Sequence, residues 1–198
     1  MKFYDIEQNS EDWLALRLGK FTASTFSDLF MKKETAGYKK AIRKVVFERL
    51  TMESPESFSS DYMERGHEIE PLAREAYEIR TFNTVTNGGF FELDSWIGAS
   101  PDGLINDDGI LEIKSPAYNT LIDYLLDNRL PNQYTYQVQG QLLVTGRKWC
   151  HFIAYHPKLP MLFVEVLPNP IIQNQIKEAL GQAVREASEM IERIKNIK

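Results

Sequence analysis

Two short segments, SPDG at residues 100–103 and LEIK at residues 111–114, decide how this chain is interpreted. Pro-Asp-Gly is typical of a tight turn, and the second segment has the alternation of a strand. On a strand, Glu112 and Lys114 point to one face and Ile113 to the other. If the intervening chain folds back as a hairpin, Asp102 lies beside Glu112. We therefore expect two carboxylates and a lysine to converge on one patch of a sheet.

This grouping has a chemical use that ordinary surface residues lack. Carboxylate oxygens are hard ligands that suit Mg²⁺, which keeps several waters and is usually held by one or two carboxylates together with substrate phosphates. Such an ion lowers the pKa of a bound water and neutralises charge on a phosphoryl group. A neighbouring lysine can orient or deprotonate that water. The alternative is an ordinary turn followed by the solvent face of an amphipathic strand.

The surrounding pattern predicts an α+β fold with a central mixed β-sheet flanked by helices. We expect one domain over residues 1–198, with a helical part at about 1–80, a catalytic core at about 81–167 and a C-terminal helix at about 169–198. The period changes from 3.6 to 2 after Arg80, where four short strands form an antiparallel meander. The expected strands are 90–93, 96–99, 104–106, 110–114, 148–155 and 162–166, and the expected helices include 38–50, 134–144 and the segment from 171 onward.

Composition narrows the class of protein. The chain has 198 residues, a formal net charge of −5 and one cysteine, Cys150, which excludes an internal disulfide and a cysteine-rich metal cage. No apolar run approaches the roughly 18 residues that span a membrane, and the N-terminus lacks a signal-peptide core, so we expect a cytoplasmic protein.

Charge is segregated: residues 17–49 carry nine basic and three acidic residues, and residues 51–112 carry three basic and fourteen acidic ones. This division is typical of a protein that holds a polyanion with one part and a divalent metal with another, although two solvated helices would also produce it.

Three further stretches occur in a recognisable order around the two opening segments. They are residues 13–24 (WLALRLGKFTAS), 65–74 (RGHEIEPLAR) and 136–141 (YQVQGQ). Together with the Pro-Asp and Glu-x-Lys pair, they resemble the lambda exonuclease family, also called the YqaJ-type viral recombinases, of the PD-(D/E)xK nuclease superfamily. The resemblance covers roughly residues 13–155 and implies a restriction-endonuclease-like core.

The resemblance also implies roles for individual residues. Asp102, Glu112, Glu70 and the backbone carbonyl of Ile113 correspond to metal ligands, with Mg²⁺ as the expected ion and Mn²⁺ as a substitute. Lys114 corresponds to the catalytic lysine. The remaining matched positions are Gln137, which supports the catalytic site, and Arg17, Ser24 and Ser100, which grip a terminal 5′-phosphate. A guanidinium and two hydroxyls are suitable donors for a phosphate.

Several of these residues have structural alternatives. Glu70 and Arg74 stand at i,i+4, the spacing of a surface ion pair on a helix. His67 lies one turn before Glu70 and is a second candidate for the metal site. Gln137 and Gln141 can instead satisfy buried backbone groups, Ser24 can cap a helix, and Arg17 can lie over Trp13.

The expected function is a Mg²⁺-dependent exonuclease that degrades one strand of double-stranded DNA from a 5′-phosphorylated end, in the 5′-to-3′ direction. From the resemblance we also expect a homotrimeric ring around DNA, a single-strand annealing protein as partner, and a phage or prophage gene expressed in a bacterial cytoplasm. The alternatives are a structure-specific or restriction-like endonuclease on the same core, and a non-catalytic module that binds DNA ends.

Overall fold

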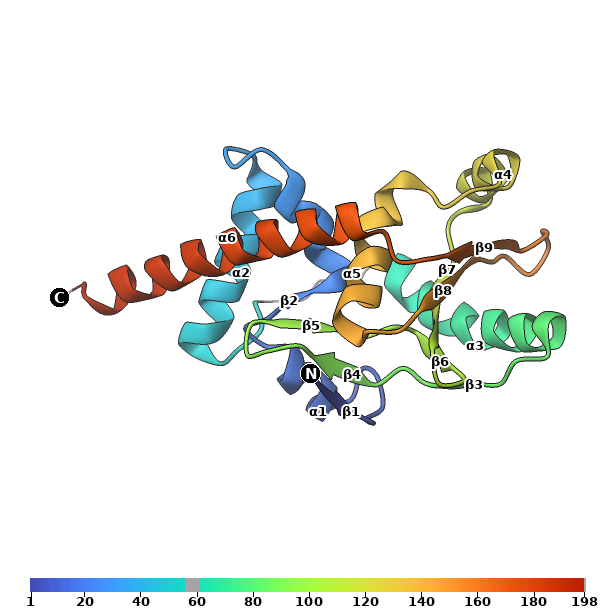
Figure 1. Cartoon of the computed structure of the whole chain (residues 1–198), viewed down its shortest axis with the longest axis horizontal. Coiled ribbons are helices and arrows are strands. Elements are labelled where there is room, and N and C mark those ends of the chain that lie inside the picture. The colour runs from blue at the N-terminus through green and yellow to red at the C-terminus, as the bar shows by residue number, and fades with distance from the viewer. Residues whose placement is uncertain (56–60, 198) are drawn as a thin grey trace.

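The strands form two mixed sheets that meet where the chain passes from residue 99 to residue 103. The computed structural model describes the chain except residues 56–60 and 198 and the side chains of residues 61–68. One sheet has four strands in the order β1-β4-β5-β2, and the other has five in the order β3-β6-β7-β8-β9 (Figure 1). Each contains one parallel pair, β2 with β5 and β7 with β8, while the other neighbours are antiparallel.

Helices cover both sheets, and most elements lie within two residues of their expected positions. The strands are β1 (Lys2–Tyr4), β2 (Phe21–Thr22), β3 (Val85–Asn87), β4 (Phe90–Glu92), β5 (Ile97–Ala99), β6 (Gly103–Ile105), β7 (Gly109–Lys114), β8 (Trp149–Ala154) and β9 (Leu162–Val166). The helices are α1 (Glu11–Arg17), α2 (Ala36–Thr51), α3 (Asp61–Thr81), α4 (Tyr118–Asp127), α5 (Thr135–Thr145) and α6 (Pro170–Lys195), with 3₁₀ helices η1 (Ala23–Phe30) and η2 (Asn132–Tyr134).

The expected single meander is wrong. β4 pairs with β5 and β6 pairs with β7, but β5 and β6 belong to different sheets. The chain crosses between the sheets at Ser100-Pro101-Asp102, where proline has no backbone N–H to donate to a sheet ladder. Asp102 therefore stands at a junction of the fold and not in an ordinary hairpin turn.

Helix α5 occupies the centre of the molecule and is packed on several sides. It contacts η1, α6, β5 and β8, and its Val138 and Leu142 are buried in the larger core cluster. Gly140 permits close approach to η1, because a Cβ atom there would lie 2.4 Å from Cδ2 of Phe26. This tight packing fixes the rotation of α5 and hence the direction of its polar face.

A smaller core cluster joins α3 to the outer face of the five-stranded sheet. Ala73 and Tyr77 of α3 pack there against Ile113 of β7 and Ile153 of β8. Helix α6 contacts α2 and α5 and extends past the rest of the chain to the C-terminus (Figure 1). Within the part of the chain that the structure describes, no helix has the length and apolar character needed to cross a membrane.

The structure predicts a pH dependence of stability from His151, which is buried beside the smaller cluster. Its Nδ1 lies 2.7 Å from the hydroxyl of Tyr77, and its Nε2 lies 3.3 Å from Oε2 of Glu165. Burial lowers the pKa of His151 from its ordinary 6.5, although Glu165 opposes the shift. A histidine whose pKa is lower in the folded than in the unfolded state stabilises the protein above the unfolded value, and this contribution is lost as the pH falls below 6.5.

We therefore expect urea unfolding between pH 7 and pH 5.5 to show a loss of stability that is smaller in His151→Phe. Glu165→Gln is the matched control, and we expect it to change the pH-dependent loss of stability in the opposite direction. Removing this acid lowers the pKa of His151 further, so the loss should be larger than in the parent protein. Equal slopes in all three proteins would show that His151 does not control this pH dependence.

Candidate active site

The β6–β7 hairpin brings Asp102 beside Glu112 and Lys114. Gly103 is paired with Leu111, so the residue before β6 lies next to the middle of β7. Oδ2 of Asp102 accepts a hydrogen bond of 2.6 Å from the backbone N–H of Ile113. Nζ of Lys114 lies 2.5 Å from Oε1 of Glu112, while the Ile113 side chain packs on the other face in the smaller core cluster. The structure thus gathers the two acids and the lysine as the sequence predicted.

Glu112 is the most firmly held of these groups. Its side chain is only 1% exposed. Gln137 Nε2 donates to Oε1 at 2.6 Å, and Gln141 Nε2 donates to Oε2 at 2.6 Å. Both glutamines come from α5, where residues four apart share a face. With Lys114 these are three donors on one carboxylate, which has about four lone-pair sites, so capacity for a cation remains.

Gln141 was not selected from the sequence as a site residue, although it completes this arrangement. The signal available was its i,i+4 spacing from Gln137 in the YQVQGQ segment, which places both amides on one helix face. Its Oε1 is buried and has no hydrogen-bond partner among the described residues. Gln137 and Gln141 therefore fix the rotamer of Glu112 by hydrogen bonds to both of its carboxylate oxygens.

The electrostatic environment of the site raises the pKa of two of its groups, Asp102 and Lys114. Burial and then the negative charge of Glu112 raise the pKa of Asp102 well above its usual range, and Glu70 adds to the rise. Burial opposes the charge of Lys114, but attraction to Glu112 and Asp102 outweighs it, so the pKa of Lys114 is raised. The Lys114 ammonium thus faces the buried Glu112 carboxylate and the half-buried Asp102 carboxyl group.

The donor set fits a hard divalent cation. Buried carboxylates that repel each other are stabilised by an ion between them, and oxygen ligands are what Mg²⁺ prefers. Among the described residues, no three histidine, cysteine or acidic side chains are close enough to form a ready-made metal cage. Two carboxylates leave coordination positions for water and substrate phosphate, which suits an ion such as Mg²⁺.

Glu70 lies on α3 near this group, and one of its two carboxylate oxygens is paired with Arg74. Its Oε1 is 3.5 Å from NH2 of Arg74, the i,i+4 ion pair that the sequence allowed as an alternative. The same guanidinium donates to the backbone carbonyl of Asp102 at 2.6 Å. Arg74, which the sequence did not single out as a site residue, thus fastens α3 to the Asp102 junction. The side chain of His67, the other candidate on this helix, lies outside the described residues.

The three residues expected to hold a 5′-phosphate are linked through two others. The Arg17 guanidinium lies 4.1 Å over the ring of Trp13, and its NH2 is 3.5 Å from Oγ1 of Thr22. Oγ1 of Thr22 is in turn 3.2 Å from Oγ of Ser24. The Trp13 indole N–H donates to Oγ of Ser100 at 2.9 Å, two residues before Asp102. A continuous set of contacts therefore connects Arg17 to the acidic site.

The Ser100 hydroxyl makes two hydrogen bonds within the protein. It donates to the carbonyl of Gly89 at 2.5 Å while accepting from Trp13. Because a serine has one hydroxyl proton, that proton is already used. In this arrangement Ser100 fixes Trp13, and Trp13 supports Arg17.

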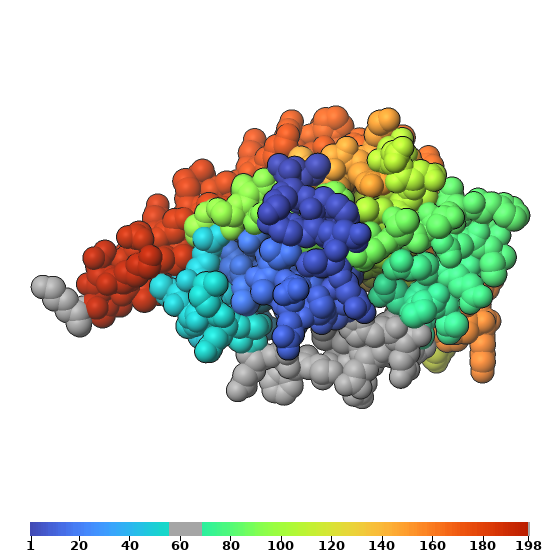
Figure 2. Space-filling view, turned by 90° about the horizontal axis from the view of Figure 1, so that it is seen from below, coloured from blue at the N-terminus to red at the C-terminus, as the bar shows by residue number. Residues whose placement is uncertain are grey.

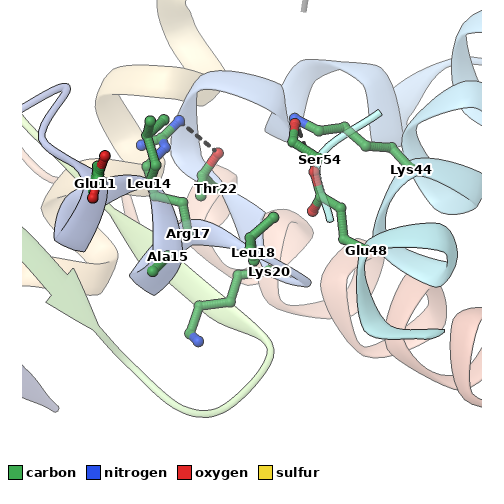
Figure 3. A pocket seen from close by; sticks show the side chains of 10 residues that line it. All are labelled: Glu11, Leu14, Ala15, Arg17, Leu18, Lys20, Thr22, Lys44, Glu48 and Ser54. Carbon is green, nitrogen blue, oxygen red and sulfur yellow. Dashed lines mark hydrogen bonds and ion pairs between the residues drawn. The ribbon is translucent and has the colours of Figure 1, made fainter. Parts of the chain in front are cut away.

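Arg17 borders a cavity of about 390 Å³ (Figure 3). Burial lowers the pKa of Arg17 to about 10, with Glu48 opposing the shift, so the guanidinium stays charged at neutral pH. Glu48 is 4% exposed and accepts a hydrogen bond of 2.9 Å from the backbone N–H of Gly19. The other lining residues are Glu11, Leu14, Ala15, Leu18, Lys20, Thr22, Lys44 and Ser54. The half-buried Arg17 supplies, together with Lys20 and Lys44, three positive charges against the two negative charges of Glu11 and Glu48, and its guanidinium suits a phosphate.

Comparisons with known proteins agree with this geometry. A sequence model of the YqaJ-like viral recombinase domain matches residues 12–148. The crystal structure of an alkaline exonuclease, LHK-Exo from Laribacter hongkongensis, is similar with a TM-score of 0.87 and 32% identity, covering 94% of this chain and 96% of that one. Its complex with dAMP has a TM-score of 0.88 and 33% identity, covering 94% and 96% of the two chains.

A more distant structure shares the fold alone. The phage related exonuclease from Haemophilus somnus 129PT has a TM-score of 0.68 and 13% identity, covering 88% of this chain and 96% of that one. A search of curated proteins found no match. The expected α+β fold class, with mixed sheets flanked by helices, is confirmed, and so is the resemblance on which the residue assignments were based.

Proposed function

Because the chain belongs to the YqaJ-like viral recombinase family, we propose that it is a Mg²⁺-dependent enzyme that degrades one strand of double-stranded DNA from a 5′-phosphorylated end. Family membership and the similarity to an alkaline exonuclease make it a recombinase-type exonuclease. The dependence on Mg²⁺, the 5′-to-3′ direction and the preference for a 5′-phosphate are our proposal. The observation that carries it is the carboxylate of Glu112, held by Gln137, Gln141 and Lys114 beside Asp102.

Asp102 and Glu112 would hold the divalent ion, with the Ile113 carbonyl and Glu70 as further oxygen donors, and Mn²⁺ would substitute for Mg²⁺. A bound ion of this kind supplies Lewis acidity, lowers the pKa of a water and offsets charge on the scissile phosphoryl group. Gln137 and Gln141 keep Glu112 in one rotamer, which is the preorganisation that electrostatic catalysis requires.

Lys114 has a role that follows from its charge. Since its pKa is raised by the two carboxylates, it is an ammonium that donates hydrogen bonds and accepts none. It is therefore suited to orient the attacking water and to stabilise negative charge that develops on the phosphate. This favours the orienting role over the deprotonating one.

Arg17 supplies the end recognition. A guanidinium binds a phosphate through two parallel hydrogen bonds, and Thr22 and Ser24 lie beside it as hydroxyl donors. Ser100 would act by holding Trp13 under Arg17. We further propose a homotrimer that encloses DNA, which would retain a substrate with few phosphate contacts, and a single-strand annealing protein as partner in phage-type recombination in a bacterial cytoplasm.

A labelled linear duplex tests the proposal. We expect nucleotides to be released from the 5′ end of each strand in Mg²⁺ or Mn²⁺, faster with a 5′-phosphate than with a hydroxyl, and not at all in EDTA. Closed circular DNA should stay intact. Release from 3′ ends would contradict the polarity, and cleavage of the circle would favour the endonuclease. Binding of ends without any release would favour the non-catalytic module.

A further inference from the structure

The exposed side of α2 carries a dense positive charge. Lys39, Lys40, Arg43 and Lys44 stand at i, i+1, i+4 and i+5, and Phe47 follows one turn later. All five side chains are exposed, and we call them the α2 basic face. The opposite side of the helix is buried through Ile42, Val45 and Val46. A chain with a net charge of −5 therefore gathers four positive charges on two turns of one helix.

Most of this charge has no ion-pair partner among the residues that the structure describes. Within the described residues, no acidic group lies at ion-pair distance from Lys39, Lys40 or Arg43, and Lys44 is 3.7 Å from Glu48. Like charges at i,i+4 repel each other and destabilise a helix. The pairs Lys39–Arg43 and Lys40–Lys44 have this spacing. A polyanion bound to the face would remove the repulsion.

The α2 basic face also lines a hollow. Glu34, Ala36 and Pro55 complete its wall, and its volume is about 660 Å³. Phe47 is 41% exposed at this hollow, an aromatic surface among cations. Lysine and arginine clustered along one helix are typical of surfaces that contact a nucleic-acid backbone.

The hollow adjoins the cavity of Arg17. Lys44 lines both, and in Figure 3 its side chain reaches from α2 toward Glu48 and Ser54 at the edge of that cavity. In Figure 2 the C-terminal part of α2 (cyan) and the N-terminal elements (blue) are seen on the same face of the molecule. Lys44 therefore links the lining of the Arg17 cavity to Lys39, Lys40 and Arg43 in the neighbouring hollow.

We propose that the α2 basic face binds backbone phosphates of the DNA outside the terminal nucleotide, and so forms a second contact surface for the substrate. The inference rests on the proposed function, because it takes DNA as the polyanion and the Arg17 cavity as the site of the 5′ end. Lysine and arginine neutralise phosphates without reading sequence, so the surface adds affinity and salt dependence but no sequence preference.

The test compares DNA binding by two triple variants in the Asp102→Asn background, in which digestion should be strongly slowed, and in the presence of EDTA. Lys39→Gln/Lys40→Gln/Arg43→Gln removes three charges from the α2 basic face. Lys177→Gln/Arg193→Gln/Lys195→Gln removes three from exposed positions of α6 and is the matched control. The dissociation constant of a 5′-phosphorylated duplex is measured by fluorescence anisotropy over a range of NaCl concentrations.

We expect the α2 variant to bind about 10-fold more weakly and to lose about 2.7 from the slope of log K against log salt, at about 0.9 per phosphate contact. The α6 control should match the parent. The variant Lys39→Arg/Lys40→Arg should keep the parental slope, because only charge is needed. Equal slopes for the α2 and α6 variants would overturn the inference.

Two further measurements distinguish failure of this inference from misfolding of the variant and from failure of the proposed function. Removing like-charge pairs should leave the melting temperature of the α2 variant unchanged or higher, which shows that it is folded. If the parent digests linear DNA and the α2 variant binds as tightly as the parent, the inference fails alone. If the parent releases no nucleotides but the α2 variant still binds more weakly, the proposed function fails and the contact surface stands.

Discussion

Replacing Asp102 by asparagine should reduce nucleotide release by about 10³-fold, a size expected when a preorganised charged group is lost from the transition state. Asparagine keeps the shape of the side chain, and its carbonyl oxygen can still accept the hydrogen bond from Ile113. What it removes is the negative charge next to Glu112. The loss of activity would therefore report on charge and not on folding.

The same substitution should stabilise the protein in EDTA. Burial and Glu112 raise the pKa of Asp102, so the folded state binds a proton more tightly than the unfolded state does. For a carboxyl group with a raised pKa, stability increases as the pH falls through the folded pKa, and the ionised group costs stability at neutral pH. The asparagine carries no charge, so the variant should melt at a higher temperature at pH 7 and lose this pH dependence.

Asp107→Asn is the matched control for both measurements. Asp107 is exposed in the turn between β6 and β7, five residues from Asp102. It should have parental activity in single-turnover digestion and a parental melting temperature. Parental activity in Asp102→Asn would remove the metal site from the proposal. If Asp102→Asn instead melts at a lower temperature than the parent in EDTA, the protein stabilises the Asp102 carboxylate more strongly than its contacts in the structure indicate.

The acidic site was accessible from sequence because its parts are local. Asp102, Glu112 and Lys114 lie within one hairpin, where strand alternation and turn chemistry fix which side chains share a face. Gln137 came from the family resemblance. Arg74 and Trp13 were missed as site residues because their roles arise from contacts with Asp102 and Ser100, 28 and 87 residues away. Sequence spacing carries no information about such distant pairs.

The fold shows the same division between local and distant determinants. Strand positions followed from alternation, and β9 has the bounds that were expected. Which strands pair did not follow, because β5 and β6 each have suitable partners in different sheets. The sequence predicted a helix from residue 171 onward, and Ile191 of α6 is buried while Ile194 is 45% exposed and Ile197 is 75% exposed. Helical periodicity predicts a face but not where the neighbouring elements end.

Replacing Arg17 by glutamine should abolish most of the preference for 5′-phosphorylated over 5′-hydroxyl ends. Hydrogen bonds to a charged group contribute about 1.5–3 kcal/mol each, so a bidentate phosphate contact of about 3 kcal/mol corresponds to roughly a 10²-fold loss on phosphorylated ends. Hydroxyl ends lack the phosphate that Arg17 would bind and should be affected much less. The measurement is the ratio of kcat/KM for the two kinds of end on otherwise identical duplexes.

Two variants within the same network make this prediction specific. Lys20 lines the cavity but lies 3.3 Å from Glu92, so Lys20→Gln should leave the ratio close to that of the parent. Trp13→Phe keeps an aromatic ring under Arg17 but loses the hydrogen bond to Ser100, and the ratio should fall by less than in Arg17→Gln. An equal effect of Lys20→Gln and Arg17→Gln would mean that the cavity attracts phosphate by its total charge. If the ratio of kcat/KM is unchanged in Arg17→Gln, Arg17 does not recognise the 5′-phosphate, and end recognition lies elsewhere on the protein.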